Sequence, residues 1–140
     1  MRDYQRQRVY DWEDAVIRPR CPGVISFANS QTYVDGVWLA HGWERPPKVM
    51  PRRATRRVVA NGTYGVINLP DKIAGWSILH ELAHSLTDDK HGPNFVGVYI
   101  DLLERVEKIS KLMTMYTLQQ AEIDFNLGVK PLDWVIRRSK

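Results

Sequence analysis

Apolar residues in the second half of the chain recur at helical spacing. From Phe95 to Met113 they follow one another at alternating steps of four and three, with charged residues between them. This spacing places the apolar side chains on one face of a helix. Pro93 fits the first turn of that helix because its φ is fixed and it lacks an N–H group. The pattern therefore predicts a helix over residues 93–113.

Shorter patterns predict three further helices. Residues 3–17 carry an apolar stripe, and residues 72–87 carry an apolar face that would pack against a core. Residues 117–127 lead to Gly128, a residue type that is favoured just after the end of a helix.

Four short runs predict strands. They cover residues 24–28, 32–39, 56–60 and 63–69. The last two flank Asn61-Gly62, the strongest short signal for a hairpin turn. Residues 41–51 contain three prolines and a glycine and are expected to form a loop. The chain is therefore predicted to be one α+β domain, residues 1–140, with a small, mostly antiparallel sheet packed on helix 72–87 and further helices.

Composition narrows the class of protein. A chain of 140 residues with 44% hydrophobic and 26% charged residues suits one globular domain. The single cysteine, Cys21, excludes an internal disulfide and a cysteine-based zinc ribbon. The charged start does not fit a signal peptide, and no apolar run reaches the ~20 residues that span a membrane. We expect a cytoplasmic protein that does not contact a membrane.

Positive charge is clustered in the segment PRRATRR, within a chain of net charge +4. Clusters of this kind can contact nucleic-acid phosphates or an acidic protein. Solvated surface is the simpler interpretation, because a short basic run is a weak motif. Nucleic acid is therefore a secondary expectation as a partner, through Arg52, Arg53, Arg56 and Arg57.

The segment HELAH fits the pattern H-E-x-x-H, in which two histidines bind zinc. On helix 72–87, His80 and His84 lie one turn apart on the same face, so both rings can bind one ion. Glu81 follows His80 and can reach a metal-bound water without being a ligand itself. Three of the four histidines, including His91, fall within residues 80–91. The spacing predicts one zinc site per chain.

Catalytic zinc usually has three protein ligands and keeps one position open for water. His91 is the preferred third ligand because it follows closely and precedes the predicted helix 93–113. Glu104 and Glu122 are alternatives, since some zinc enzymes use a downstream carboxylate. An additional donor to the oxyanion is expected, with His41, Tyr64 and Tyr116 as candidates.

Two motifs, HELAH at 80–84 and HGPNF at 91–95, resemble those of zincin-type metallopeptidases and in particular of SprT-like (Spartan-like) proteins. The chain is also similar to small metallohydrolases of actinobacteria and their phages. The resemblance covers residues 63–106. It implies a zincin-like fold, zinc ligands at His80, His84 and His91, and a catalytic acid/base at Glu81. The sequence departs from the metzincin spacing, because Thr87 stands at the glycine position and His91 comes one residue late.

These residues predict a zinc-dependent hydrolase, most simply a metallopeptidase. A zinc-activated water would attack the peptide carbonyl with Glu81 as general base, while residues 63–69 would hold the peptide in extended form. Two alternatives fit the same residues. One is a non-proteolytic zinc amidohydrolase with the same ligands. The other is a nucleic-acid or protein-binding module with structural zinc, in which Glu81 would have no purpose.

Overall fold

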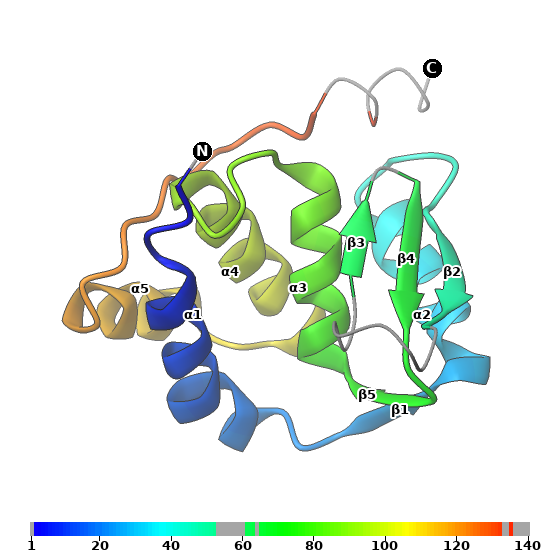
Figure 1. The fold of residues 1–140 in the computed structure, drawn as a ribbon, viewed down its shortest axis with the longest axis horizontal. Helices are drawn as coiled ribbons and strands as arrows, with labels where there is room; N and C mark the ends of the chain where they lie inside the picture. The colour runs from blue at the N-terminus through cyan, green and yellow to red at the C-terminus, as the bar shows by residue number, and fades with distance from the viewer. Residues whose placement is uncertain (1, 53–60, 64, 133–134, 136–140) are drawn as a thin grey trace.

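The computed structural model describes residues 2–52, 61–63, 65–132 and 135. In this part of the chain it contains five α-helices and two small sheets, which confirms the α+β class (Figure 1). The helices are α1 (Arg6–Trp12), α2 (Phe27–Ala40), α3 (Gly75–Leu86), α4 (Pro93–Glu107) and α5 (Lys111–Gln120). The strands are β1 (Val24–Ser26), β2 (Lys48–Pro51), β3 (Asn61–Thr63), β4 (Val66–Leu69) and β5 (Lys72–Ala74).

Two of the three described strand pairings are antiparallel. Strands β1 and β5 form one antiparallel pair, and the second sheet has the order β2-β4-β3. Within it, β3 runs antiparallel to β4, whereas β2 runs parallel to β4. Strand β4 is therefore paired on both sides. Among the described strands, β3 is the edge on the side of helix α3 (Figure 1).

Helix α3 lies at the centre of the fold, between β3 and α4 (Figure 1). It begins directly after β5, with Ala74 in extended conformation, and it ends at Leu86, beyond which Thr87 is extended again. Its apolar face is fully buried, and each such side chain contributes about 2 kcal/mol relative to exposure. The buried apolar side chains of this face are Ile78, Leu79, Leu82 and Leu86.

The predicted strand at residues 32–39 is wrong, because these residues belong to helix α2. The buried positions in α2 are Ser30, Val34, Val37 and Trp38. This spacing of four, three and one is that of a helical face. The valines suggested a strand, but their β propensity is weaker than the packing of that face against the core.

Other predicted boundaries also shift. The helix expected over residues 93–113 ends at Glu107, where Lys108 adopts a left-handed conformation with φ of 60°. Ser110 then caps α5 by accepting a hydrogen bond from Met113 N. Helix α5 begins before the expected residue 117 and ends before 127. A local turn, which apolar spacing does not register, divides the long stripe into two helices.

The hairpin is also placed differently from the prediction. Asn61-Gly62 lies within β3, and the turn falls between Thr63 and Val66, where Gly65 has φ of 85°. The last residues of the expected loop 41–51 form β2, and the first residues of the expected helix 72–87 form β5. The strand predicted at residues 56–60 lies outside the described residues.

Gly97 on helix α4 allows a close approach of the chain that follows α5. A Cβ atom at this position would collide with the backbone carbonyl of Asn126, whose N–H donates to Pro93 O at 2.9 Å. We expect Gly97→Ala to lower the free energy of unfolding by about 1–3 kcal/mol, as overpacking does. Urea denaturation measures this loss. Gly36→Ala is the matched control, because nothing lies within 4 Å of its Cβ in α2, and alanine should be neutral or stabilising there. Equal stability of Gly97→Ala and the wild type would contradict the close contact.

Candidate metal centre

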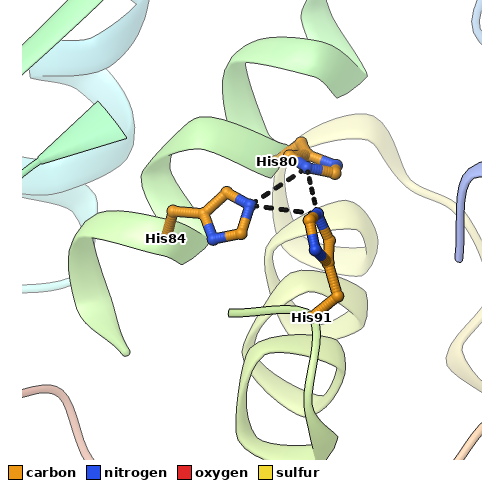
Figure 2. A group of neighbouring side chains, drawn as sticks. All are labelled: His80, His84 and His91. Carbon is orange, nitrogen blue, oxygen red and sulfur yellow. Dashed lines mark hydrogen bonds between the residues drawn. The ribbon is translucent and has the colours of Figure 1, made fainter. Parts of the chain in front are cut away.

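The three predicted histidines meet at one point (Figure 2). His80 and His84 lie one turn apart on α3, and His91 lies in the loop between α3 and α4. The Nε2 atom of His84 is 3.2 Å from the Nε2 atoms of both His80 and His91, and the latter two are 3.3 Å apart. The rings thus direct one nitrogen each to the corners of a nearly equilateral triangle.

This triangle has the dimensions of a tetrahedral metal site. Zinc–nitrogen bonds of about 2.0–2.1 Å in tetrahedral geometry separate two ligand nitrogens by about 3.3–3.4 Å. The observed separations of 3.2–3.3 Å match that value. The three histidines can therefore hold one metal ion, and the fourth corner of the tetrahedron would remain for water or substrate.

The positions of the ring hydrogens explain why a cation would stabilise three nitrogens so close together. Nδ1 of His80 lies 2.7 Å from Glu13 Oε2, and Nδ1 of His91 lies 2.8 Å from Asp3 Oδ2. Because a carboxylate only accepts, each Nδ1 carries the hydrogen, and each Nε2 of a neutral ring carries a lone pair. His84 can donate to only one of these two atoms. A proton or a metal ion between the nitrogens removes the remaining repulsion.

The loop that carries His91 is fixed by the beginning of the chain. Asp3 accepts from the backbone N–H of His91 at 3.2 Å as well as from its ring. Gln5 is buried and donates to the carbonyls of His91 and Asp124, while its own oxygen accepts from Asp124 N at 2.6 Å. Two side chains near the N-terminus thus join the His91 loop to the segment after α5.

Asp89 fixes the same loop from the other side. Its carboxylate accepts hydrogen bonds from Asn94 N at 2.8 Å and Phe95 N at 3.0 Å, in the first turn of α4. These N–H groups have no partner within the helix, and their capping typically stabilises a protein by about 1 kcal/mol. Asp89 O also accepts from Gly92 N. Consequently His91 is held between two anchored points.

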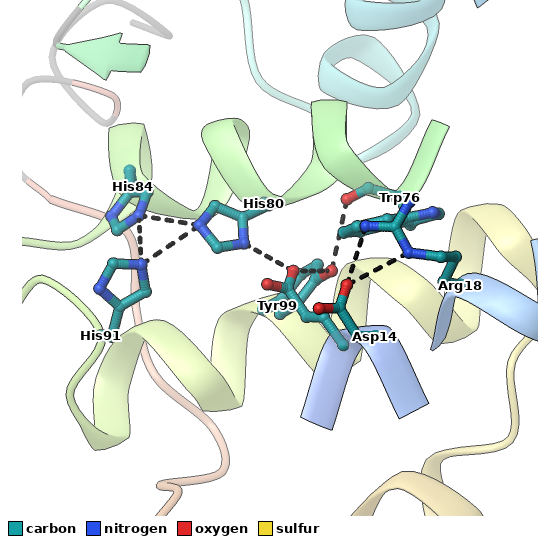
Figure 3. A network of polar contacts seen from close by, with 8 residues as sticks. Asp14, Arg18, Trp76, His80, His84, His91 and Tyr99 are labelled. Carbon is teal, nitrogen blue, oxygen red and sulfur yellow. Dashed lines mark hydrogen bonds and ion pairs between the residues drawn. The ribbon is translucent and has the colours of Figure 1, made fainter. Parts of the chain in front are cut away.

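Glu13 connects His80 to the protein interior. Figure 3 shows His80 between the other two histidines and Tyr99. Its Oε2 atom accepts from His80 Nδ1 and from the hydroxyl of Tyr99 at 2.6 Å. Tyr99 lies on α4, is fully buried and is also 3.4 Å from Trp76 O. Burial and the neighbouring Glu13 carboxylate raise the pKa of Tyr99 well above its ordinary value, so its hydroxyl keeps its proton.

Burial and neighbouring charges give the three histidines different pKa values. Burial, together with the charges of His80 and His91, lowers the pKa of His84 to about 2. Burial also lowers the pKa of His91, despite its hydrogen bond to Asp3. For His80 the effect of burial is outweighed by the bond to Glu13, and the pKa is raised. Glu13 is 3% exposed and Asp3 20%, so water weakens the effect of Asp3 more.

Aromatic rings enclose the triad. Phe95 stacks on His84 with ring centroids 4.3 Å apart, and it meets His80 and His91 edge-on. Tyr10 of α1 lies parallel to His80 at 5.9 Å and edge-on to His91 at 5.1 Å. These rings restrict the rotation of the imidazoles, which keeps the three Nε2 atoms directed at one another.

The alternative third ligands do not join the histidine cluster. Within the described residues, the cluster with metal-ligand geometry consists of His80, His84 and His91. Glu104 accepts a hydrogen bond from Lys111 N at the far end of α4. Glu122 lies beyond α5, and its carbonyl accepts from Arg8.

Two of the candidate oxyanion donors lie in other surroundings. His41 stacks on Trp43 at the end of α2, and its Nδ1 is 2.7 Å from Val37 O. Tyr116 is 60% exposed and accepts from Gln120. Tyr64 lies outside the described residues, as do Arg53, Arg56 and Arg57. Contact of the arginine cluster with nucleic acid therefore stays a prediction.

Several residues of the centre carry no recognisable signal in the sequence. Asp3, Gln5 and Glu13 belong to a charged N-terminal segment in which acidic and amide residues are ordinary. Tyr99 was expected only as part of the apolar stripe of its helix. Asp89 precedes Gly92-Pro93, and an acidic residue just before a helix is a weak sign of a cap.

Comparisons with known proteins identify no relative: no family model, no curated protein and no solved structure matches the chain. Among the described residues, no helix combines the length and the apolar character needed to cross a bilayer. Functional interpretation therefore depends on the geometry of the three histidines and their partners.

Proposed function

We propose that the protein is a zinc-dependent hydrolase, and specifically a metallopeptidase. The observation that supports this most directly is the triangle of Nε2 atoms from His80, His84 and His91, with sides of 3.2–3.3 Å. Glu81 follows the first of these histidines on the same helix. These residues belong to the two motifs, HELAH and HGPNF, that resemble those of SprT-like proteins. A zincin-like fold is part of the proposal.

The proposed chemistry assigns one role to the ion and one to Glu81. When bound by three histidines, zinc lowers the pKa of a water molecule toward about 7 and polarises a carbonyl oxygen. Glu81 would take a proton from the attacking water as the water oxygen bonds to the carbonyl carbon, and would pass that proton to the amine nitrogen as the C–N bond breaks. At 100° per residue, Glu81 is rotated about 60° from His84 around α3, which places it at the flank of the histidine face.

The sheet suggests where an extended substrate would bind. The sequence pointed to residues 63–69, but β4 is paired on both sides and has no free edge. Strand β3 is the edge beside α3 among the described strands. A peptide added to β3 would run past the helix that carries Glu81. This arrangement favours a peptide or protein substrate over a small amide.

The proposal is tested by digesting a peptide library with the zinc-loaded protein. We expect cleavage that stops when a chelator removes the metal and returns when zinc is added back, since the water and the carbonyl both depend on the ion. Mass spectrometry of the peptide fragments measures the cleavage. Hydrolysis of small amides without cleavage of any peptide would favour the amidohydrolase alternative. A zinc-loaded protein that hydrolyses neither would favour a binding module with structural zinc.

A further inference from the structure

The first residues of the chain reach both elements that carry the histidines. Asp3 binds the ring of His91, 88 positions away, and Glu13 binds the ring of His80, 67 positions away. Each contact joins a carboxylate oxygen to Nδ1, on the opposite side of the imidazole from the nitrogen that faces the triad. Two of the three histidines are thus oriented by a segment that has no metal-ligand motif of its own.

Glu13 is an improbable residue for a purely structural position. It is almost completely buried, and burying a carboxylate is costly unless hydrogen bonds compensate for it. Replacing a whole buried ion pair by well-packed apolar side chains of similar volume is often neutral or stabilising. Here the carboxylate is retained and accepts from both His80 and Tyr99. Its contacts therefore point to the chemistry of His80.

The backbone also departs from regularity at this position. Helix α1 ends at Trp12, and a π-helical segment runs from Glu13 to Ile17. Wide π turns are rare and are found often at functional sites. The widening begins at the residue whose carboxylate meets His80. A regular α-helix continued through Glu13 would change the rotation at which this side chain leaves the helix axis.

We propose that Asp3 and Glu13 are positioning residues of the metal centre, and that the N-terminal segment is part of the metal site. Each carboxylate holds Nδ1–H, fixes the tautomer with its lone pair on Nε2, and increases the basicity of that nitrogen toward a divalent cation. The inference rests on the proposed zinc binding by His80, His84 and His91. It does not depend on peptidase activity.

The test compares the zinc affinity of folded variants by competition with a chromogenic chelator. Glu13→Gln and Asp3→Asn keep an acceptor oxygen but remove the charge, and each should raise the zinc Kd about 10–100-fold. Asp14→Asn is the matched control for Glu13→Gln: it makes the same charge change one residue away, in a side chain that is 62% exposed and paired with Arg18. Its Kd should stay within about twofold of wild type, because exposed pairs contribute little.

A second readout separates positioning from a general loss of structure. Cobalt absorption reports the geometry and ligand field of the bound ion, so its bands should shift in Glu13→Gln and Asp3→Asn but not in Asp14→Asn. Melting of the metal-free proteins shows which variants fold. If Glu13→Gln does not fold, Asp3→Asn decides, since Asp3 is partly exposed and near the chain start.

The outcomes distinguish this inference from the proposed function. Suppose that the wild type binds zinc and that both variants have the same zinc Kd and the same cobalt bands as the wild type. This result would overturn the inference and leave the proposed function standing. Wild-type protein that binds no zinc would overturn both. Weaker binding with altered cobalt bands in both variants, and normal behaviour of Asp14→Asn, is the result that we expect.

Discussion

Replacing His80, His84 or His91 singly by alanine is expected to weaken zinc binding greatly. Zinc sites with four ligands have apparent binding free energies of about 10–16 kcal/mol, so each ligand contributes about 3 kcal/mol and its loss raises the Kd roughly 100-fold or more. The three nitrogens are nearly equidistant, which predicts losses of similar size at all three positions. Metal content after gel filtration and chelator competition measure the effect.

The fourth histidine is the natural control for this series. His41 stacks on Trp43 at the end of α2, so His41→Ala should keep about one zinc per chain. Glu104→Ala and Glu122→Ala should also retain it. The three-histidine assignment would be wrong if His91→Ala kept zinc while either glutamate variant lost it.

Glu81→Gln is expected to separate metal binding from hydrolysis. The substitution keeps the size of the side chain but removes the carboxylate, so a proton can no longer be taken from the attacking water. Loss of a positioned general base lowers rates by about 10²–10⁴-fold. Zinc content and melting temperature should stay near those of wild type, because Glu81 is not a member of the ligand triangle. Turnover of a peptide found in the library digest measures the rate.

Glu104→Gln is the matched control for this variant. It makes the same chemical change on helix α4, where Glu104 contacts Lys111, and it should leave turnover unchanged. Near-normal activity of Glu81→Gln would exclude this residue as the base. Equal loss in both variants would attribute the effect to overall charge instead of position.

The carboxylates beside the histidines change the net charge around the candidate metal position. Three neutral histidines alone would leave the full double charge of zinc unopposed. Asp3 and Glu13 add two negative charges at the outer nitrogens of His80 and His91. With a cation in place, they would strengthen its binding and would also reduce its pull on the proton of a bound water. Such a centre would combine tight binding with a moderated acidity of the water.

The centre could be predicted because most of its geometry is local. HELAH places His80 and His84 one helical turn apart wherever the helix forms, and the apolar residues around them ensure that it does. His91 follows within a short loop that ends at Pro93, so the chain has little freedom to place it elsewhere. Ligand spacing and helix periodicity are properties of neighbouring residues, which a sequence records directly.

Tertiary structure decided the features that depend on distant residues. Val34 and Val37 suggested a strand by propensity, but packing against the core made them helical in α2. Asp3 and Glu13 are ordinary acidic residues in the sequence, and they acquire a role only when the chain brings them against His91 and His80. Such contacts depend on the free energy of the whole fold. A carboxylate can be buried only where the folded chain supplies hydrogen-bond donors to it. The local pattern determined which three histidines meet, and the folded chain alone determined what holds them.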